Sequence, residues 1–316
     1  MAFDLVTIGC VCADVKVQPV DEIPKRGTLA LVPSLEMTMG GLAGVTAAVF
    51  SRLGGKAAFA GCLGKDPFGA FIIESFQELG VNTQGIRRVD NHKTAATVVL
   101  IDSKGERTFL HHVGTVGIVS EEDIDFELAK RTKVFHWGGP GLTTKLHGKP
   151  IARVFKKIQS KGVMTSIDTC FDGSGTWLPL MEEALHHTSI LCTSMSEAPH
   201  YAGKSDPKEI LDFFSGYGIE YILLKMGEHG MLARHKNETV AFRAHQVPVV
   251  DGTGAGDAAC AGFIYGIIHG WPLAKSCALA NAVGALTVQT SGAAGKAISL
   301  QAANKLMEKE PCQLSS

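Results

Sequence analysis

The sequence lacks an excess of charge of either sign. Its 30 Lys and Arg residues are balanced by 31 Asp and Glu residues, which leaves a formal net charge of −1 at pH 7. A chain without a basic excess has no electrostatic reason to bind nucleic acid or an anionic membrane. No apolar run approaches the length of a membrane span. We therefore expect neither a nucleic-acid partner nor a membrane partner.

A zinc-type cysteine pattern and a basic leader are also missing. Cys10 and Cys12 are too close together for a zinc knuckle, and no partner pair follows them. The 8 cysteines lie in apolar stretches and are expected to be buried thiols. The N-terminus has no basic cluster and carries Asp4 early, so it predicts a strand rather than a signal peptide. Together these features predict a cytoplasmic protein.

The composition is that of a protein with a large core, since 45% of the 316 residues are hydrophobic and 19% are charged. This length allows one large α/β domain or two domains. In the middle of the chain, predicted helices alternate with predicted strands, which is typical of a parallel sheet with helices on both faces. The helices are expected at 121–130, 147–160 and 178–187, and the strands at 133–137, 163–168 and 189–192.

A glycine-rich turn near the C-terminus has the clearest chemistry. The apolar residues at 247–250 predict the end of a strand, and Gly252, Gly254 and Gly256 then allow a sharp turn. An apolar helix follows from Asp257. The free N–H groups and the dipole of its first turn favour an anion such as phosphate. Asp257 could accept a proton from a hydroxyl that attacks the phosphate, or it could be an ordinary first-turn acid.

The run Asp-Gly-Thr-Gly-Ala-Gly-Asp-Ala-Ala-Cys-Ala-Gly-Phe, residues 251–263, closely resembles the C-terminal signature of the ribokinase-like (PfkB-type) carbohydrate kinases. The resemblance covers nearly the whole chain. It implies a single domain over residues 1–316, an α/β fold in which an αβα sandwich with a central, mostly parallel sheet carries a small β-sheet lid. The resemblance implies that the backbone of Gly254, Ala255 and Gly256 forms the anion hole and that Asp257 is the catalytic base.

The lid is expected from about 15–38 and 94–113. The first stretch has apolar segments broken by prolines and a glycine, and the second has two β-rich runs around Lys104-Gly105, a hairpin signal. His111 and His112 are adjacent, so at most one of them faces the acceptor. The resemblance also allows a homodimer formed through this lid.

The acceptor is implied to bind where strands end in the sheet. Asp14 follows the first predicted strand and matches the family's carboxylate that binds substrate hydroxyls. Gly40 and Gly41 match a glycine pair that approaches the sugar, and Asp168 ends a later strand at the same edge. Val45, however, stands where the family has an Asn that binds sugar hydroxyls. Because Val neither donates nor accepts, the resemblance is weaker here than at the phosphates.

The resemblance also implies which residues bind the nucleotide and its metal ions, beside the anion hole. Glu197 matches a Glu that orders Mg²⁺ through water, and Asp251 and Thr253 match a potassium site completed by the loop 290–295. Ser194 and Glu197 also have the spacing of a helix capping box, and the two interpretations are compatible. The implied nucleotide-binding residues are Ser194, Lys225, Gly227, Gly230 and Asn281.

These features together predict an ATP-dependent kinase that phosphorylates a hydroxyl of a small sugar or sugar-like acceptor, with Asp257 as the base. A nucleoside (adenosine-like) kinase of the same fold is one alternative. A non-catalytic sugar- or nucleotide-binding protein is another, although such a protein would not need Asp257 and Glu197. A dinucleotide-binding oxidoreductase fits poorly, because Asp257 replaces the third glycine of its fingerprint.

Overall fold

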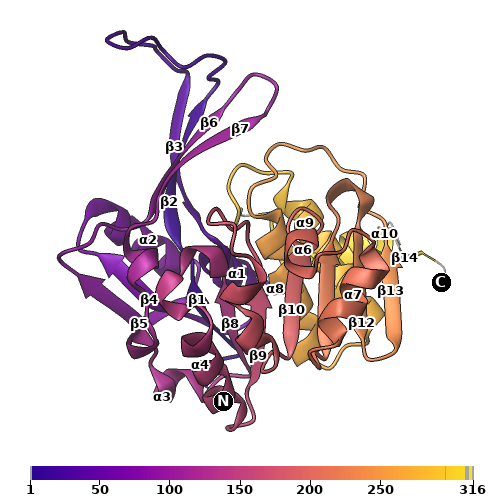
Figure 1. Ribbon diagram of the computed structural model, residues 1–316. Helices are drawn as coiled ribbons and strands as arrows, with labels where there is room; N and C mark the ends of the chain where they lie inside the picture. Colours follow the sequence, from indigo (N-terminus) through magenta and orange to yellow (C-terminus); the bar gives the residue numbers. More distant parts are fainter. Residues whose placement is uncertain (1, 296, 310–312, 315–316) are drawn as a thin grey trace.

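The computed structural model describes residues 2–295, 297–309 and 313–314. Within these ranges the strands form a ten-stranded sheet and a four-stranded sheet. In Figure 1 the four strands of the smaller sheet rise from one end of the main body as a projecting lid. This arrangement confirms the predicted α/β sandwich with a β-sheet lid. None of the described helices is long and apolar enough to cross a membrane.

The larger sheet is parallel over most of its width. Strands β5, β4, β1, β8, β9, β10 and β11 lie side by side and parallel, and β12, β13 and β14 extend the sheet antiparallel. All residues of β1 are buried, as expected for a strand covered on both faces. The carboxyl ends of the parallel strands meet at one edge. The strands are β1 (Leu5–Gly9), β4 (Ala57–Gly64), β5 (Asn82–Val89), β8 (Val134–Gly138), β9 (Met164–Asp168), β10 (Ile190–Ser194), β11 (Tyr221–Lys225), β12 (Met231–His235), β13 (Glu238–Phe242) and β14 (Gln313–Leu314).

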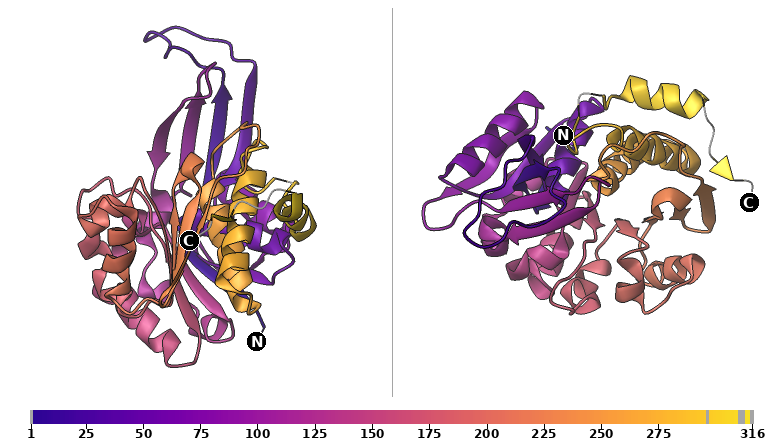
Figure 2. Two further views of the ribbon diagram at one scale, coloured as in Figure 1. Left: turned by 90° about the vertical axis from the view of Figure 1, so that its right-hand side faces the viewer. Right: turned by 90° about the horizontal axis from the view of Figure 1, so that it is seen from above.

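Helices cover both faces of this sheet, as the view from above in Figure 2 shows. The two hydrophobic cores follow the alternation of side chains along each strand: in β10, Ile190 and Cys192 belong to one core and Leu191 to the other. One core receives residues from α1 (Leu42–Arg52), α2 (Pro67–Glu78), α8 (Ala255–Ile268), α9 (Leu273–Thr287) and α10 (Leu300–Lys309). The other receives residues from α3 (Phe126–Ala129), α4 (Lys149–Gln159), α5 (Glu182–Leu185), α6 (Ala198–Ala202) and α7 (Pro207–Ser215).

Helix α8 is apolar on nearly all sides because it lies inside the first of these cores, packed against α1 and α9. Small residues allow the close approach: a Cβ added to Gly262 would lie 3.1 Å from Ala280 Cα in α9. The helix is thereby fixed along its length. Its N-terminal turn, which carries the predicted anion hole, is therefore held in a constant position.

The lid consists of β2 (Cys12–Gln18), β3 (Ser34–Gly40), β6 (Ala96–Ile101) and β7 (Arg107–His112), in the order β3-β2-β6-β7. The register places Asp14 beside Thr97 and Thr97 beside His111. Since side chains alternate along a strand, these residues share one face of the lid, which we call the inner face. The strands lie in the two predicted stretches, although β2 begins earlier and β3 ends later than expected.

Some predicted elements differ in the structure. The predicted strand at 247–250 is wrong: this segment belongs to neither sheet, and Val249 and Val250 are 72% and 64% exposed. Pro248 has no N–H to donate to a sheet. The predicted helix 121–130 is divided, because the Asp125 side chain accepts hydrogen bonds from the N–H groups that begin α3. The predicted helix 178–187 is likewise a 3₁₀ turn followed by the short α5.

Candidate active site

The predicted anion hole lies where the turn 251–254 enters α8. Gly254 is the N-cap residue, with φ 76°, and no side chain caps the helix there. A Cβ on Gly254 would lie 2.1 Å from the Cβ of Ala293, so the turn requires glycine for both its dihedral angle and its space. The N–H groups of an uncapped first turn are available to an anion.

A buried ion pair adjoins this turn. Lys225, at the end of β11, contacts Asp168, at the end of β9, with 2.7 Å between Nζ and Oδ1. The Lys225 ammonium also donates to the backbone oxygen of Gly256 at 3.4 Å. The second carboxylate oxygen of Asp168, Oδ2, is buried and has no hydrogen-bond partner among the described residues. The structure thus brings together Asp168, Lys225 and the anion-hole turn, which are far apart in the sequence.

The carboxyl groups of this cluster have raised pKa values. Burial raises the pKa of Asp168 to about 7, against the effect of the Lys225 ammonium. Burial also raises the pKa of Asp257 to about 6, opposed by Lys225 and reinforced by Glu197 and Asp14. Asp257 is half-buried in the first turn of α8. A carboxyl group that exchanges its proton near neutral pH is suited to accept one from a substrate hydroxyl.

Glu197 faces this cluster from the loop after β10. Its Oε2 accepts a hydrogen bond from the Thr169 hydroxyl at 2.7 Å, and that hydroxyl lies 2.8 Å from the hydroxyl of Thr193. The capping-box interpretation is wrong: α6 begins at Ala198, Glu197 is its N-cap residue, and its side chain makes no capping hydrogen bond. The hydroxyl of Ser194 instead lies 2.8 Å from that of Ser196.

The acceptor side is built around Asp14, which is 6% exposed. A Cβ on Gly40 would lie 2.0 Å from Asp14 Oδ2, so Gly40 makes room for this carboxylate. Burial raises the pKa of Asp14, opposed by hydrogen bonds from Cys12 and Thr97. The Thr97 hydroxyl also lies 3.0 Å from Nδ1 of His111. Asp14, Thr97 and His111 therefore form a polar row across the inner face of the lid.

Gly41 and Val45 lie at the start of α1. Gly41, with φ 87°, is its N-cap residue, and a Cβ there would lie 2.7 Å from the backbone of Val11. Val45 is 1% exposed and belongs to the core. Its Cγ1 would lie 3.3 Å from a Cβ added to Gly254, so the side chain packs directly against the anion-hole turn. The roles of both residues in acceptor binding stay predictions.

Three of the predicted nucleotide-binding residues, Gly227, Gly230 and Asn281, have structural roles within the protein. Gly227 and Gly230 form the turn between β11 and β12, closed by a 2.8 Å hydrogen bond from the Met226 N–H to the Gly230 oxygen. Asn281, in α9, donates to the backbone oxygen of Arg243 at 2.8 Å. These contacts explain the residue types without a nucleotide, and the nucleotide roles of these residues remain predictions.

Lys16 and Arg107 were missed by the sequence analysis. Both extend from the lid to the turn before α8: Lys16 Nζ donates to Asp251 Oδ2, and Arg107 donates to the Thr253 hydroxyl at 2.8 Å. The available signal was strand periodicity, because Lys16 is two residues from Asp14 and so shares its face of β2. The pairing with Asp251 needed the tertiary structure.

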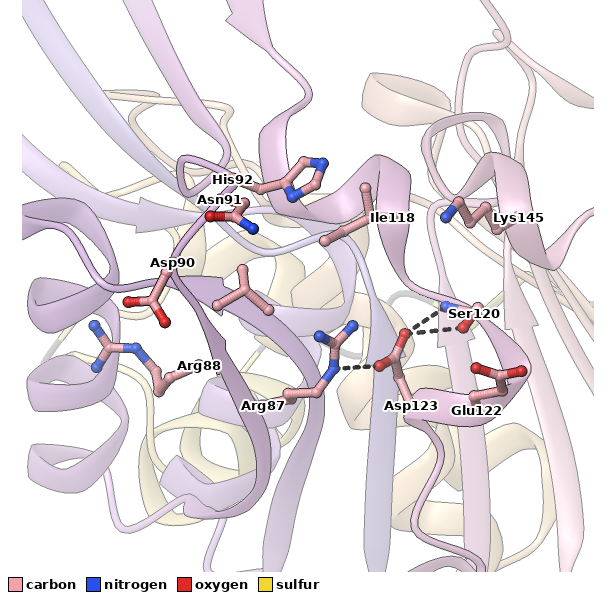
Figure 3. A pocket seen from close by; sticks show the side chains of 11 residues that line it. Arg87, Arg88, Asp90, Asn91, His92, Ile118, Ser120, Glu122, Asp123 and Lys145 are labelled. Carbon is pink, nitrogen blue, oxygen red and sulfur yellow. Dashed lines mark hydrogen bonds and ion pairs between the residues drawn. The ribbon is translucent and has the colours of Figure 1, made fainter.

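A polar hollow of about 710 Å³ lies apart from this cluster, and Figure 3 shows the side chains that line it. Arg87 points toward Asp123, which also accepts hydrogen bonds from the N–H and hydroxyl of Ser120. Positively and negatively charged side chains line the hollow. None of the predicted site residues is among them. Its lining residues are Arg87, Arg88, Val89, Asp90, Asn91, His92, Ile118, Ser120, Glu122, Asp123 and Lys145.

The fold is an α/β sandwich with a charged cluster at the carboxyl edge of its sheet, and comparison with known proteins gives its family. A model of the pfkB family carbohydrate kinases matches residues 2–299. The chain therefore belongs to this family, and it is a carbohydrate kinase by that membership.

Individual relatives agree with this assignment. The chain is 28% identical to a fructokinase of Salmonella typhimurium over 266 residues, which cover 80% of this chain and 87% of the relative. It is also 28% identical to the aminoimidazole riboside kinase of Salmonella typhimurium, over 80% of this chain and 83% of the relative. The structure of Arabidopsis thaliana ribokinase complexed with ribose and ATP superposes with a TM-score of 0.82 at 25% identity, covering 98% of this chain and 99% of that one.

Proposed function

We propose that this carbohydrate kinase transfers a phosphoryl group from ATP to a hydroxyl of a small sugar or sugar-like acceptor, with Asp257 as the general base. The observation that carries the proposal is the position of Asp257. It lies in the uncapped first turn of α8, and burial raises its pKa to about 6. A base with such a pKa can take the acceptor's proton while the adjoining amides bind the phosphoryl group.

Residues around Asp257 would stabilise the charge of the transferring group. The N–H groups of residues 254–256 would bind its oxygens, and the ammonium of Lys225 would add a positive charge beside them. Asp168 orients that ammonium through the 2.7 Å contact. Phosphoryl transfer depends mainly on such positioning and charge stabilisation.

A bound magnesium ion would supply positive charge that balances the charge of the phosphates. Among the described residues, no group of three or more His, Cys, Asp or Glu could hold a metal. A magnesium ion of this kind needs no such group, because one or two carboxylates, waters and substrate phosphates suffice. Glu197, held by Thr169, is the carboxylate that we assign to the ion's water shell.

ATP is proposed as the donor because a related structure, Arabidopsis ribokinase, was determined with ribose and ATP. The assigned nucleotide site lies on the β10–β12 side of the sheet. It combines positive charge from Lys225 with tight turns that let the backbone approach a ligand. Its residues are Ser194, Lys225, Gly227, Gly230 and Asn281.

The acceptor is assigned to the space between the lid and the carboxyl edge of the sheet, with Asp14, Gly40, Gly41, Val45 and Asp168 as its residues. A nucleoside is the second candidate, favoured by the likeness to an aminoimidazole riboside kinase and by the apolar Val45. A non-catalytic binding protein is disfavoured, because the chain belongs to a kinase family and keeps a carboxyl group with a raised pKa at the anion hole.

We also assign a homodimer to the outer face of the lid, the face opposite Asp14. Several of its apolar side chains are exposed, and the register places Met37 and Val98 on either side of Val15, with Leu110 beyond Val98. An exposed apolar patch is typical of a protein interface, and a two-fold dimer would bury the same patch of both copies. If the dimer forms here, Leu110→Lys should give monomers in light scattering, whereas the wild type should give dimers. A wild-type monomer would contradict this assignment.

The test of function is a panel of sugars, sugar acids and nucleosides assayed with ATP and magnesium for acceptor-dependent ADP release. At least one acceptor should give ADP and a phosphorylated product in equal amounts. Binding of ATP without ADP release for any acceptor class would instead support the non-catalytic alternative. The predicted cytoplasmic location is independent of this test and stays a prediction.

A further inference from the structure

The positive charge nearest to Asp251 belongs to the protein itself. Asp251 lies in the turn just before the anion hole, and its Oδ2 accepts a hydrogen bond from the Lys16 ammonium on lid strand β2. The two side chains are only 3% and 6% exposed. A buried carboxylate requires a compensating charge, and Lys16 provides it. The same carboxylate is where the family resemblance implies a potassium ion.

The other groups around Asp251 are hydrogen-bond donors. Its Oδ1 accepts from the Thr253 N–H at 2.9 Å, and its Oδ2 accepts from the Gly292 N–H at 3.4 Å. The guanidinium of Arg107 lies 3.8 Å from Oδ1. Potassium is held by oxygen atoms that replace its water shell. While the Lys16 ammonium occupies Oδ2, its charge and its position exclude that ion from the carboxylate.

We propose that the Lys16 ammonium takes the place of a monovalent cation beside the anion hole, so that this protein works without potassium. The catalytic part of this inference rests on the proposed function, whereas the ion pair does not. Lysine is a compact, singly charged group with three donors, and here it is covalently attached to β2. The charge that fixes the turn is therefore present at any potassium concentration.

The attachment also connects the turn with the acceptor site. Lys16 and Asp14 are two residues apart on the inner face of β2, so one strand carries both contacts. Glu36 lies opposite Lys16 on β3, but the hydrogen bond of Lys16 goes to Asp251. A lid that moved away from the sheet would remove Lys16 from Asp251. Lys16 thus balances the charge of Asp251 only while the lid covers the site.

The experiment compares potassium chloride with tetramethylammonium chloride at equal ionic strength. It records the melting temperature without substrate and kcat/KM with the best acceptor. The wild type should give the same values in both salts. Lys16→Met, which keeps the apolar stem and removes the charge, should melt at least about 5 °C lower than the wild type in tetramethylammonium, because the buried Asp251 keeps only the longer contact with Arg107. Potassium should then raise both its melting temperature and its kcat/KM.

Lys65→Met is the matched control, because Lys65 pairs with Asp90 at the surface, where the side chains are 55% and 69% exposed. Lys65→Met should have the melting temperature and the kcat/KM of the wild type, and potassium should change neither value. If Lys16→Met does not fold in tetramethylammonium, its refolding yield in each salt is the readout. A wild type that melts higher or works faster in potassium would overturn the proposal, and so would a Lys16→Met that never responds to potassium. The melting temperatures need no turnover, so they test the ion pair even if no acceptor is phosphorylated.

Discussion

The phosphate side and the acceptor side of the candidate site are built differently. On the phosphate side, Lys225 ends a strand of the main sheet, and Asp257 lies in the first turn of a helix buried in the core. On the acceptor side, Asp14 and His111 lie on the lid, a four-stranded sheet that projects from the body in Figure 1. The phosphate side that we propose is thus part of the main body. Of the residues that we assign to the acceptor, Asp14 and Gly40 lie on the lid, whereas Val45 and Asp168 lie in the main body.

The two sides also differ in how they follow the family pattern. The run 251–263 matches the family's signature closely, whereas Val45 stands where the resemblance implies an Asn that binds sugar hydroxyls. Phosphoryl transfer needs the same charges for every acceptor, so one set of residues serves the whole family. Acceptor choice depends on which hydroxyls find partners, so it can change with single residues. Variants on the two sides should therefore affect different properties.

The largest effect is expected at Asp257. Asp257→Asn keeps the shape of the side chain but cannot accept a proton, so kcat should fall by roughly 10²–10⁴-fold. The affinity for ATP should change little, because the amides of residues 254–256 still bind the phosphates. Turnover assays and nucleotide titrations would measure the two properties separately. If Asp257→Asn kept near wild-type kcat, Asp257 would be an ordinary first-turn acid.

Lys225→Met should affect both stability and catalysis. Removing one partner of a buried ion pair typically costs about 3–5 kcal/mol of unfolding free energy. Because Lys225 lowers the pKa of Asp168, its removal should raise that pKa further above about 7. The loss should therefore be largest at high pH, where the stranded Asp168 is charged, and smaller at low pH, where Asp168 takes up a proton. Urea unfolding at several pH values measures this loss. A loss that did not depend on pH would contradict the assigned burial of a charged Asp168.

The pH dependence of turnover should report the base. Asp257 has a pKa of about 6, raised by burial, and it acts only when deprotonated. The rate should therefore be constant above this value and fall about tenfold per pH unit well below it. A pH profile of kcat/KM would show this acidic limb, because kcat/KM reports the pKa of the free protein. An acidic limb near the ordinary pKa of an exposed Asp would mean that a different group is titrating.

The smallest effect is expected on the acceptor side, at Val45. Each hydrogen bond that a site is built to make contributes about 0.5–1.5 kcal/mol, which is about 2–10-fold in kcat/KM. Val45→Asn should therefore improve fructose and ribose by this factor relative to the best acceptor of the panel. The comparison needs kcat/KM for all three acceptors in both proteins. Efficient wild-type turnover of unmodified fructose or ribose would show that Val45 does not limit the acceptor.

The sequence alone determined the parts of this protein that depend on local order along the chain. Alternating helices and strands predicted the parallel sheet, and the prolines, glycines and hairpin signal located the lid. The glycine-rich run 251–263 located the turn and helix that carry Asp257. Two predictions were wrong because one residue changed the local structure. Pro248 has no N–H to donate to a sheet, and the apolar segment 247–250 forms no strand. Asp125 begins a new helix inside the predicted helix 121–130.

The tertiary structure decided which distant charges meet. Lys16 and Asp251 are 235 residues apart, and Lys225 and Asp168 are 57 apart. No periodicity in the sequence connects such pairs, because they form where a lid strand, two sheet strands and a helix N-terminus converge. Burial at that point raises the pKa of Asp257 and requires a partner for Asp251. The glycine-rich run in the sequence therefore predicted an anion-binding turn, while the packing of lid against sheet decided which charged side chains meet beside it.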